Sequence, residues 1–276
     1  MNTSKVNGKV VFDNTALPDV IELKKVSQSY DGGKSFVIKD FDLLVEKKKD
    51  AGDFIVILGK SGCGKSTILR YIANLQKPTS GDVLINSEPI NTSTPMVFQR
   101  YSNYPWLTVL ENVMLPFTYK GNFNEKEAKD KAMAMIKQVG LVGHEKKYAQ
   151  DAALSGGQLQ RVAIARSLIA DPKLFLMDEP FGALDINTRY QMQLLLAQIW
   201  KELQSTIVLV THSVEEAVFL GDEIYLMDSN PGRIVEHFHV PLPLERDRDT
   251  RKTKSFLNLV EEVEDALFEL IDQKKK

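Results

Sequence analysis

The sequence predicts an α/β fold with a parallel sheet flanked by helices, an antiparallel β edge and an inserted helical subdomain. Short, wholly apolar runs at 54–58, 174–177, 206–210 and 223–227 have the composition of strands buried on both faces. Helical patterns lie between these runs, and such alternation is typical of a parallel sheet. The region of about 101–165 contains no such run, so we expect the helical subdomain there.

The N-terminal part predicts a lead-in followed by the antiparallel edge. Residues 1–19 are polar and are expected to form a weakly ordered lead-in, whereas 20–30 and 36–46 each have the pattern of a strand. The charged stretch that follows, with lysines at 47–49, is expected to be a solvated hairpin tip. We expect the main domain to cover residues 20–235.

Helices are predicted in the middle of the chain. Asn124 with Glu127 three residues later indicates a helix start, and Gly140 indicates its end. The stretch 158–169 reads as a second helix, and apolar residues in 189–203 follow the stripe of a third.

The C-terminal extension, residues 236–276, ends in an amphipathic helix. Apolar residues recur at helical spacing through 256–271. We expect this helix to pack on the core, with a dimer contact as the alternative. The closing lysines, 274–276, are expected to be a solvated end, with contact to anionic lipid as the alternative.

Composition is that of a soluble globular protein, with 43% apolar and 26% charged residues among 276. The net charge of −2 gives no reason to expect a nucleic-acid partner. The single cysteine, Cys63, excludes an intrachain disulfide and fits a reducing cytosol. The chain has no apolar stretch near the roughly 20 residues of a membrane span, and no signal-peptide pattern at its start. Any role at a membrane is therefore expected to depend on a partner.

A glycine-rich loop joins the apolar run 54–58 to a helical pattern. GKSGCGKST fits G-x-x-x-x-G-K-[ST], in which glycines let backbone N–H groups approach phosphates. We expect Lys65 to reach the β- and γ-phosphate oxygens and Ser66 to ligate Mg²⁺. A fortuitous Gly/Ser turn is the alternative, and the strand–loop–helix context argues against it. The candidate nucleotide contacts here are Gly59, Lys60, Ser61, Gly62, Cys63, Gly64, Lys65, Ser66 and Thr67.

Two carboxylates follow the apolar run 174–177. Asp178 suits the coordination sphere of Mg²⁺, and Glu179 is a candidate to polarise an attacking water. An ordinary strand-to-turn exit is the alternative, but a phosphate loop in the same chain favours the catalytic interpretation.

Two further side chains are candidates for the same edge of the sheet. His212 follows the run 206–210, and ligands of open α/β sheets bind beyond the carboxyl ends of strands. We therefore expect it to contact the γ-phosphate rather than to be purely structural. Gln99 follows the apolar residues PMVF and is a candidate to contact Mg²⁺ or water.

A second glycine-rich stretch, LSGGQ at 154–158, stands at the start of a predicted helix, where backbone N–H groups form an anion site. Together the motifs resemble those of the ATP-binding cassette (ABC) ATPases, over roughly residues 20–235. GKSGCGKST resembles the Walker A motif of this P-loop NTPase family, LFLMDE Walker B, LSGGQ the signature motif and ALD at 183–185 the D-loop. Gln99 and His212 resemble the Q-loop glutamine and the switch histidine.

The resemblance implies ATP and Mg²⁺ as ligands and a dimer as the working unit. It implies that Tyr30 stacks on adenine and that LSGGQ caps the γ-phosphate of ATP held by a second ATPase subunit, identical or closely homologous. Glu179, His212 and Gln99 are then the catalytic candidates, and Ser66, Gln99 and Asp178 the metal candidates. The remaining implied nucleotide contacts are Tyr30, Ser155, Gly156, Gly157, Gln158 and Asp185.

The resemblance further implies a transporter subunit. A single cassette without long helical arms favours this over the ABC ATPases of DNA repair or translation. The segments 104–113 and 229–249 resemble the nitrate/sulfonate/taurine importer group, with an exporter or lipid-transport subunit as the alternative. Expected partners are membrane permease subunits and, indirectly, a solute-binding protein, with the chain peripheral on the cytoplasmic face of the cell's inner membrane. Trp106 is a candidate permease contact, or else a core residue.

Overall fold

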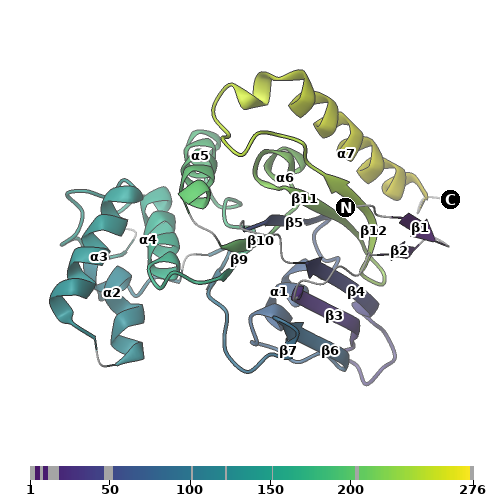
Figure 1. Cartoon of the computed structure of the whole chain (residues 1–276), viewed down its shortest axis with the longest axis horizontal. Helices are drawn as coiled ribbons and strands as arrows, with labels where there is room; N and C mark the ends of the chain where they lie inside the picture. Colours follow the sequence, from purple (N-terminus) through teal and green to yellow (C-terminus); the bar gives the residue numbers. More distant parts are fainter. Residues whose placement is uncertain are drawn as a thin grey trace. The chain divides into compact units, whose positions relative to one another are not determined.

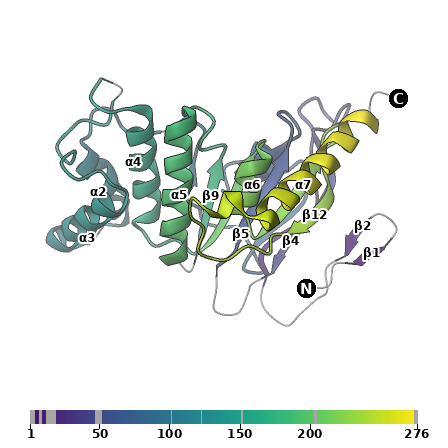
Figure 2. The same ribbon diagram turned by 90° about the horizontal axis from the view of Figure 1, so that it is seen from above.

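The computed structural model describes most of the chain. The described residues are 4–6, 9–11, 19–46, 52–100, 102–121, 123–150, 152–202 and 205–273. They form two compact units, of which the first is Met1–Thr94 with Thr206–Lys276 and the second is Pro95–Ser205. Both units combine strands with helices (Figures 1 and 2). The lysine runs 47–49 and 274–276 lie outside the described residues.

The main sheet of the first unit is organised around strand β5 (Phe54–Gly59). It lies between β10 (Thr206–Thr211) and β11 (Glu223–Asp228) and runs parallel to both. β12 (Arg233–His239) pairs with β11 in the antiparallel direction. Every residue of β5 and β10 is buried, as expected of strands that are covered on both faces. The predicted parallel sheet is therefore confirmed.

A second, antiparallel sheet in the first unit confirms the predicted antiparallel β edge. Its strand β3 (Asp19–Gln28) lies between β4 (Ile38–Glu46) and β6 (Ser80–Ile85), and β7 (Glu88–Pro89) pairs with β6. On β4, buried and exposed residues alternate over most of the strand, because one face is covered. β6 and β7 were not predicted, since none of their residues is buried and an apolar run is missing.

The expected N-terminal lead-in contains two short strands. β1 (Ser4–Val6) pairs with β2 (Lys9–Val11) in the antiparallel direction. Each is three residues long, too short for hydrophobic periodicity to reveal it from sequence.

The helices of the first unit are α1 (Lys65–Ile72), α6 (Val214–Leu220), the short 3₁₀ helix η1 (Thr250–Lys252) and α7 (Lys254–Gln273). α7 lies alongside α6 (yellow and green in Figure 1). Phe256, Leu259 and Val263 are the buried side chains of α7. The amphipathic helix therefore packs on the core of its own unit. Among the described residues, no helix is long and apolar enough to cross a membrane.

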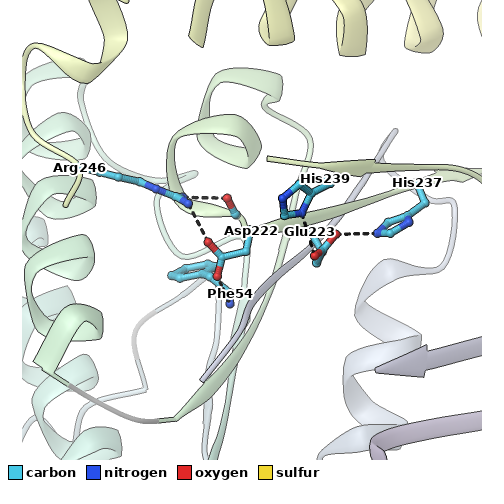
Figure 3. A network of polar contacts seen from close by, with 7 residues as sticks. Phe54, Asp222, Glu223, His237, His239 and Arg246 are labelled. Carbon is cyan, nitrogen blue, oxygen red and sulfur yellow. Dashed lines mark hydrogen bonds and ion pairs between the residues drawn. The ribbon is translucent and has the colours of Figure 1, made fainter. Parts of the chain in front are cut away.

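A buried arginine ties the C-terminal extension to this unit. The Arg246 guanidinium donates hydrogen bonds to the carbonyl oxygens of Phe219 (3.0 Å) and Gly221 (2.8 Å), and to Asp222 Oδ1 (2.8 Å). The other carboxylate oxygen of Asp222 accepts the backbone N–H of Phe54 at 3.0 Å (Figure 3). Burial lowers the pKa of Arg246, and the adjacent Asp222 carboxylate opposes this effect. One side chain thus links the extension to the beginning of β5.

A second polar cluster in the same view joins β11 to β12. The two carboxylate oxygens of Glu223 contact His237 Nε2 (2.9 Å) and His239 Nδ1 (3.0 Å) (Figure 3). The His237 ring stacks on Tyr225 with 4.5 Å between centroids. These contacts supplement the backbone pairing at the edge of the sheet.

Among its described residues, the second unit contains two parallel strands and four helices. β8 (Met96–Val97) pairs with β9 (Leu174–Asp178). The helices are α2 (Val109–Lys120), α3 (Glu125–Gln138), α4 (Gly156–Leu168) and α5 (Ile186–Glu202). As the sequence predicts, Asn124 caps α3 by accepting the backbone N–H of Glu127 at 3.2 Å. The unit extends beyond the expected helical segment of about 101–165, because it also includes both strands and α5.

Candidate active site

The phosphate loop lies between β5 and α1, as predicted. Gly64 begins α1 with φ +104°, a conformation that side chains other than glycine rarely adopt. A Cβ on Gly59 would lie 2.6 Å from the backbone oxygen of Met227. The loop therefore needs glycine at Gly64 for its backbone conformation and at Gly59 for close packing.

The lysine of this loop is held against the loop's own backbone. Lys65 is 4% exposed, and its ammonium donates to the carbonyl oxygens of Gly59 (2.8 Å) and Lys60 (3.0 Å). Ser66 beside it is half-buried, whereas Lys60, Ser61 and Gly62 are exposed. Cys63 is buried, and burial raises the pKa of its thiol. The buried, neutral thiol fits a packing role for Cys63.

His212 leaves the sheet at the same edge as the phosphate loop. Thr211 of β10 pairs with Leu58 of the parallel strand β5. The residues that follow the two strands therefore leave the sheet at the same edge. Thr211 Oγ1 donates to the Glu216 carboxylate at 2.6 Å, and Ser213 accepts the backbone N–H of Glu216 at 3.3 Å. These bonds fix the turn into α6 and leave His212 exposed.

Tyr30 lies on a loop organised by Asp31. The Asp31 carboxylate accepts hydrogen bonds from the backbone N–H of Ser35 (2.9 Å), from the hydroxyl of Ser35 (2.6 Å) and from the hydroxyl of Ser29 (2.8 Å). These bonds, led by those from Ser35, lower the pKa of Asp31 to about 2. The Tyr30 hydroxyl accepts a hydrogen bond from Gln76, while the residue remains 65% exposed. The hydrogen bonds of Asp31 thus hold the turn that carries the exposed Tyr30.

In the second unit, Gln99, Asp178 and Glu179 lie at the same edge of the paired strands β8 and β9. Val97 of β8 pairs with Met177 of β9, so the residues that follow leave one edge. Asp178 is 8% exposed at the end of β9. Gln99 lies against the turn after it, since a Cβ on Gly182 would be 3.4 Å from Gln99 Nε2.

Glu179 has an unusual backbone. Its φ is +43°, in the left-handed region that costs energy for any residue with a side chain. Gly182 N–H donates to the carbonyl oxygen of Glu179 at 3.1 Å, which closes the turn. The backbone therefore turns out of β9 at Glu179 in a strained conformation, and strain of this kind is concentrated at functional sites.

The LSGGQ stretch forms the capped start of α4. The Ser155 hydroxyl accepts the backbone N–H of Gln158 (3.3 Å), and Gln158 Oε1 accepts the backbone N–H of Ser155 (2.9 Å). This reciprocal capping box satisfies two N–H groups that would otherwise lack partners. These two hydrogen bonds therefore define the start of α4.

The D-loop segment adjoins this helix start. A Cβ on Gly157 would lie 2.3 Å from Thr188 Cγ2, so the two segments are in close contact and a side chain at Gly157 would displace Thr188. Asp185 accepts the backbone N–H of Thr188 at 3.1 Å. Hydrogen bonds from Thr188 lower the pKa of Asp185. The second unit thus brings Ser155, Gly156 and Gly157 next to the segment that carries Asp185.

The second unit also carries an aromatic patch, Tyr104 and Trp106, that sequence reasoning identified only in part. Trp106 is 67% exposed and makes an edge contact with Tyr104 at 5.3 Å between centroids. The Arg166 guanidinium lies 5.5 Å from the Tyr104 ring. Asn112, fully buried, donates to the carbonyl oxygens of Tyr104 (3.1 Å), Leu107 (3.1 Å) and Thr108 (3.0 Å). No motif marks Asn112, because its partners are mainly backbone atoms.

Comparison with known proteins identifies the family. The ABC transporter family model matches residues 45–182, and the chain belongs to this family. A nitrate import ATP-binding protein of Synechocystis sp. is 40% identical over 86% of this chain and 87% of the relative. A taurine import ATP-binding protein of Pelagibacter ubique is 41% identical over 87% and 91%. An aliphatic sulfonates import ATP-binding protein of Bacillus cereus is 38% identical over 83% and 90%.

Solved structures agree with this assignment. A dimeric bacterial ABC transporter cassette matches with a TM-score of 0.68 and 34% identity, covering 80% of this chain and 98% of its own. A dimeric cassette bound to ADP and Pi matches with a TM-score of 0.67 and 33% identity over the same shares. The predicted fold and ATPase activity are confirmed: the chain is an ATP-binding and ATP-hydrolysing subunit of an ABC transporter.

Proposed function

We propose that this subunit powers the import of a small anion of the nitrate, sulfonate or taurine class. The observation that carries the proposal is the set of relatives that are 38–41% identical over most of both chains, whose names specify nitrate, aliphatic sulfonates and taurine. The solute itself is bound by other subunits, a permease and a solute-binding protein.

We propose that nucleotide is bound in the first unit by the phosphate loop and Tyr30. The exposed Tyr30 ring stacks on adenine, and backbone N–H groups of 60–67 bind the phosphates. Lys65 exchanges its present acceptors, the carbonyl oxygens of Gly59 and Lys60, for β- and γ-phosphate oxygens. Burial of the Lys65 stem supports this role, because only the charged end has to move.

Magnesium fits the donors that the chain supplies. The Ser66 hydroxyl, the Asp178 carboxylate and the Gln99 amide oxygen are hard ligands of the kind Mg²⁺ prefers. Among the described residues, no cluster of three or more His, Cys, Asp or Glu side chains is arranged to hold a metal ion. This suits an ion held by one carboxylate together with substrate phosphates. When bound, Mg²⁺ neutralises charge on the phosphate oxygens.

Glu179 is the proposed general base. It orients a water molecule whose oxygen attacks the γ-phosphorus while the bond to the β–γ bridging oxygen breaks. The proton of the water passes toward the carboxylate of Glu179, the left-handed residue that follows β9. His212 and Gln99 contact the γ-phosphate. Both are exposed residues that lie close after strand ends: His212 directly follows β10, and Gln99 is two residues beyond the end of β8.

The signature stretch is proposed to act on a second subunit's nucleotide. Ser155 and the N–H groups of Gly156 and Gly157 form an anion site at the start of α4. The two similar cassettes solved as dimers support a pair of chains that closes on two ATP molecules. Asp185 lies beside this helix start and is placed by the proposal at the same dimer interface.

Trp106 is the proposed permease contact on the cytoplasmic face of the membrane. A tryptophan that is 67% exposed and supported by Tyr104 has the features of an interface anchor. Trp106→Ala should leave the basal ATPase rate unchanged and weaken permease binding by ~2 kcal/mol, about 30-fold. Phe268→Ala on α7, similarly exposed at 59%, is the matched control. Equal permease affinity of the Trp106 variant and the native chain would remove Trp106 from the interface.

The transport proposal is tested on the assembled complex. The chain is purified with its permease, reconstituted in vesicles with the solute-binding protein, and assayed for ATP hydrolysis with nitrate, taurine or ethanesulfonate. We expect one of these anions to stimulate hydrolysis and to accumulate on the side of the membrane that carries the ATPase subunits. Stimulation only by an unrelated solute, or movement in the opposite direction, would refute the proposed import of small anions.

A further inference from the structure

His144 contacts the signature stretch from the turn between α3 and α4. Its backbone N–H donates to Leu141 (3.1 Å), and its carbonyl oxygen accepts the N–H of Lys147 (2.9 Å), so the turn is ordered. The half-buried imidazole places Nε2 at 3.0 Å from Gln158 Nε2 and Nδ1 at 3.3 Å from the carbonyl oxygen of Val142.

The surrounding groups determine which imidazole nitrogen carries the proton. The Ser155 backbone N–H can only donate, so the Gln158 atom that it contacts at 2.9 Å must be the amide oxygen. The amide NH₂ of Gln158 therefore faces His144, whose Nε2 must accept. Nδ1 then carries the proton and donates to Val142, which can only accept. The neutral Nδ1–H form satisfies all of these contacts.

We infer that His144 is a positioning residue for the signature helix. It holds the Gln158 amide in the one orientation that completes the capping box with Ser155, and so fixes the N–H groups of Gly156 and Gly157. The inference rests on the proposed action of LSGGQ on a second subunit's nucleotide. A protonated imidazole would direct Nε2–H at the Gln158 NH₂. Turning the amide to avoid this clash would point its NH₂ at the Ser155 N–H and open the capping box.

The charged groups around this turn come from three segments. On the turn itself, Glu145 accepts the backbone N–H of Gly143 at 2.8 Å, and this hydrogen bond lowers the pKa of Glu145. On α4, Arg161 donates to the carbonyl oxygen of Val139 at 2.8 Å. On α2, whose first turn bonds to this segment, Glu111 caps its own helix through Thr108. The acceptor role of His144 toward Gln158 is thus not duplicated by these groups.

Two substitutions separate the hydrogen bond from simple packing. In His144→Gln, an amide oxygen replaces Nε2 as the acceptor for Gln158. In His144→Asn, an amide nitrogen replaces Nδ1 and keeps the bond to Val142, but nothing reaches Gln158. Both are made in a Glu179→Gln chain, and ATP-dependent dimerisation is measured by sedimentation at pH 7.5.

We expect His144→Asn to weaken dimerisation about tenfold at pH 7.5, equivalent to ~1.4 kcal/mol, with ATP affinity of the monomer unchanged. His144→Gln should dimerise like its parent at pH 7.5. Equal dimerisation by the Asn variant and its parent, or equal loss in both variants, would overturn the inference.

A second measurement separates this inference from the proposed function. Amide hydrogen exchange in the nucleotide-free monomer reports on the first turn of α4, whether or not dimers form. We expect exchange over residues 156–159 to be about tenfold faster in His144→Asn than in His144→Gln. If this difference is seen but the parent does not dimerise with ATP, the proposed trans action fails while the positioning role stands. If the two variants exchange alike, the positioning role is wrong.

Discussion

A Glu179→Gln chain is expected to bind ATP with native affinity and to hydrolyse it about 10²–10⁴-fold more slowly, the range for loss of a general base. The amide keeps the shape of the side chain and cannot accept the proton of the attacking water. The nucleotide contacts are proposed to lie elsewhere, on the phosphate loop and Tyr30, so binding is preserved. Phosphate release under saturating ATP and equilibrium binding of a fluorescent ATP analogue measure the two effects.

The same variant should accumulate closed dimers, because ATP that is not hydrolysed continues to bridge two chains. Glu264→Gln provides the control, since it removes one exposed carboxylate from α7. The control should hydrolyse ATP at the native rate. A Glu179→Gln chain with normal turnover would eliminate this carboxylate as the base.

Replacing Arg246 by alanine is expected to lower the free energy of unfolding by about 3–5 kcal/mol. The substitution leaves the carbonyl oxygens of Phe219 and Gly221 without their donor and the Asp222 carboxylate without its cation. Asp222 also accepts the N–H of Phe54, so the start of β5 should loosen. Urea unfolding followed by circular dichroism measures the change.

Two variants make this prediction specific. Arg246→Lys keeps the charge but lacks the forked donor geometry, so an intermediate loss is expected. Lys252→Ala removes an ion pair with Asp249 in which the lysine side chain is 71% exposed and the aspartate side chain 78% exposed. This substitution should change the free energy of unfolding by less than ~0.5 kcal/mol. An alanine variant as stable as the native chain would show that the extension is held by the apolar contacts of α7 alone.

The strands with continuous apolar sequence were predictable because burial on both faces leaves a direct signature. β5, β9, β10 and β11 all follow this rule. The strands β6 and β12 have few buried residues and lack that signature. The capped start of α3 was also predictable, since Asn124 and Glu127 are neighbours in sequence.

Side chains whose partners depend on how the chain folds, rather than on a local sequence pattern, could not be predicted. Arg246 binds backbone atoms about 25 residues away, and Asn112 likewise binds mainly backbone, so neither belongs to a sequence motif. Glu179 was predicted as a carboxylate after a strand, but its positive φ depends on how the following turn closes. His144 acquires its role only when the turn after α3 meets α4.

The central claim is that each ATP is bound by the phosphate loop of one chain and the LSGGQ stretch of another. Two double variants test this claim, and both carry Glu179→Gln. One also carries Lys65→Ala in the phosphate loop, and the other also carries Ser155→Arg in the signature stretch. The arginine fills the anion site without altering the chain's own phosphate loop. Each should sediment as a monomer in ATP, and the Ser155→Arg chain should still bind ATP.

Mixing the two chains restores one intact site, formed by the phosphate loop of the Ser155→Arg chain and the LSGGQ stretch of the Lys65→Ala chain. Sedimentation of the mixture in ATP should therefore reveal mixed dimers that carry about one nucleotide each. Dimers of the Ser155→Arg chain alone, at the affinity of its Glu179→Gln parent, or a mixture that stays monomeric, would contradict the shared site.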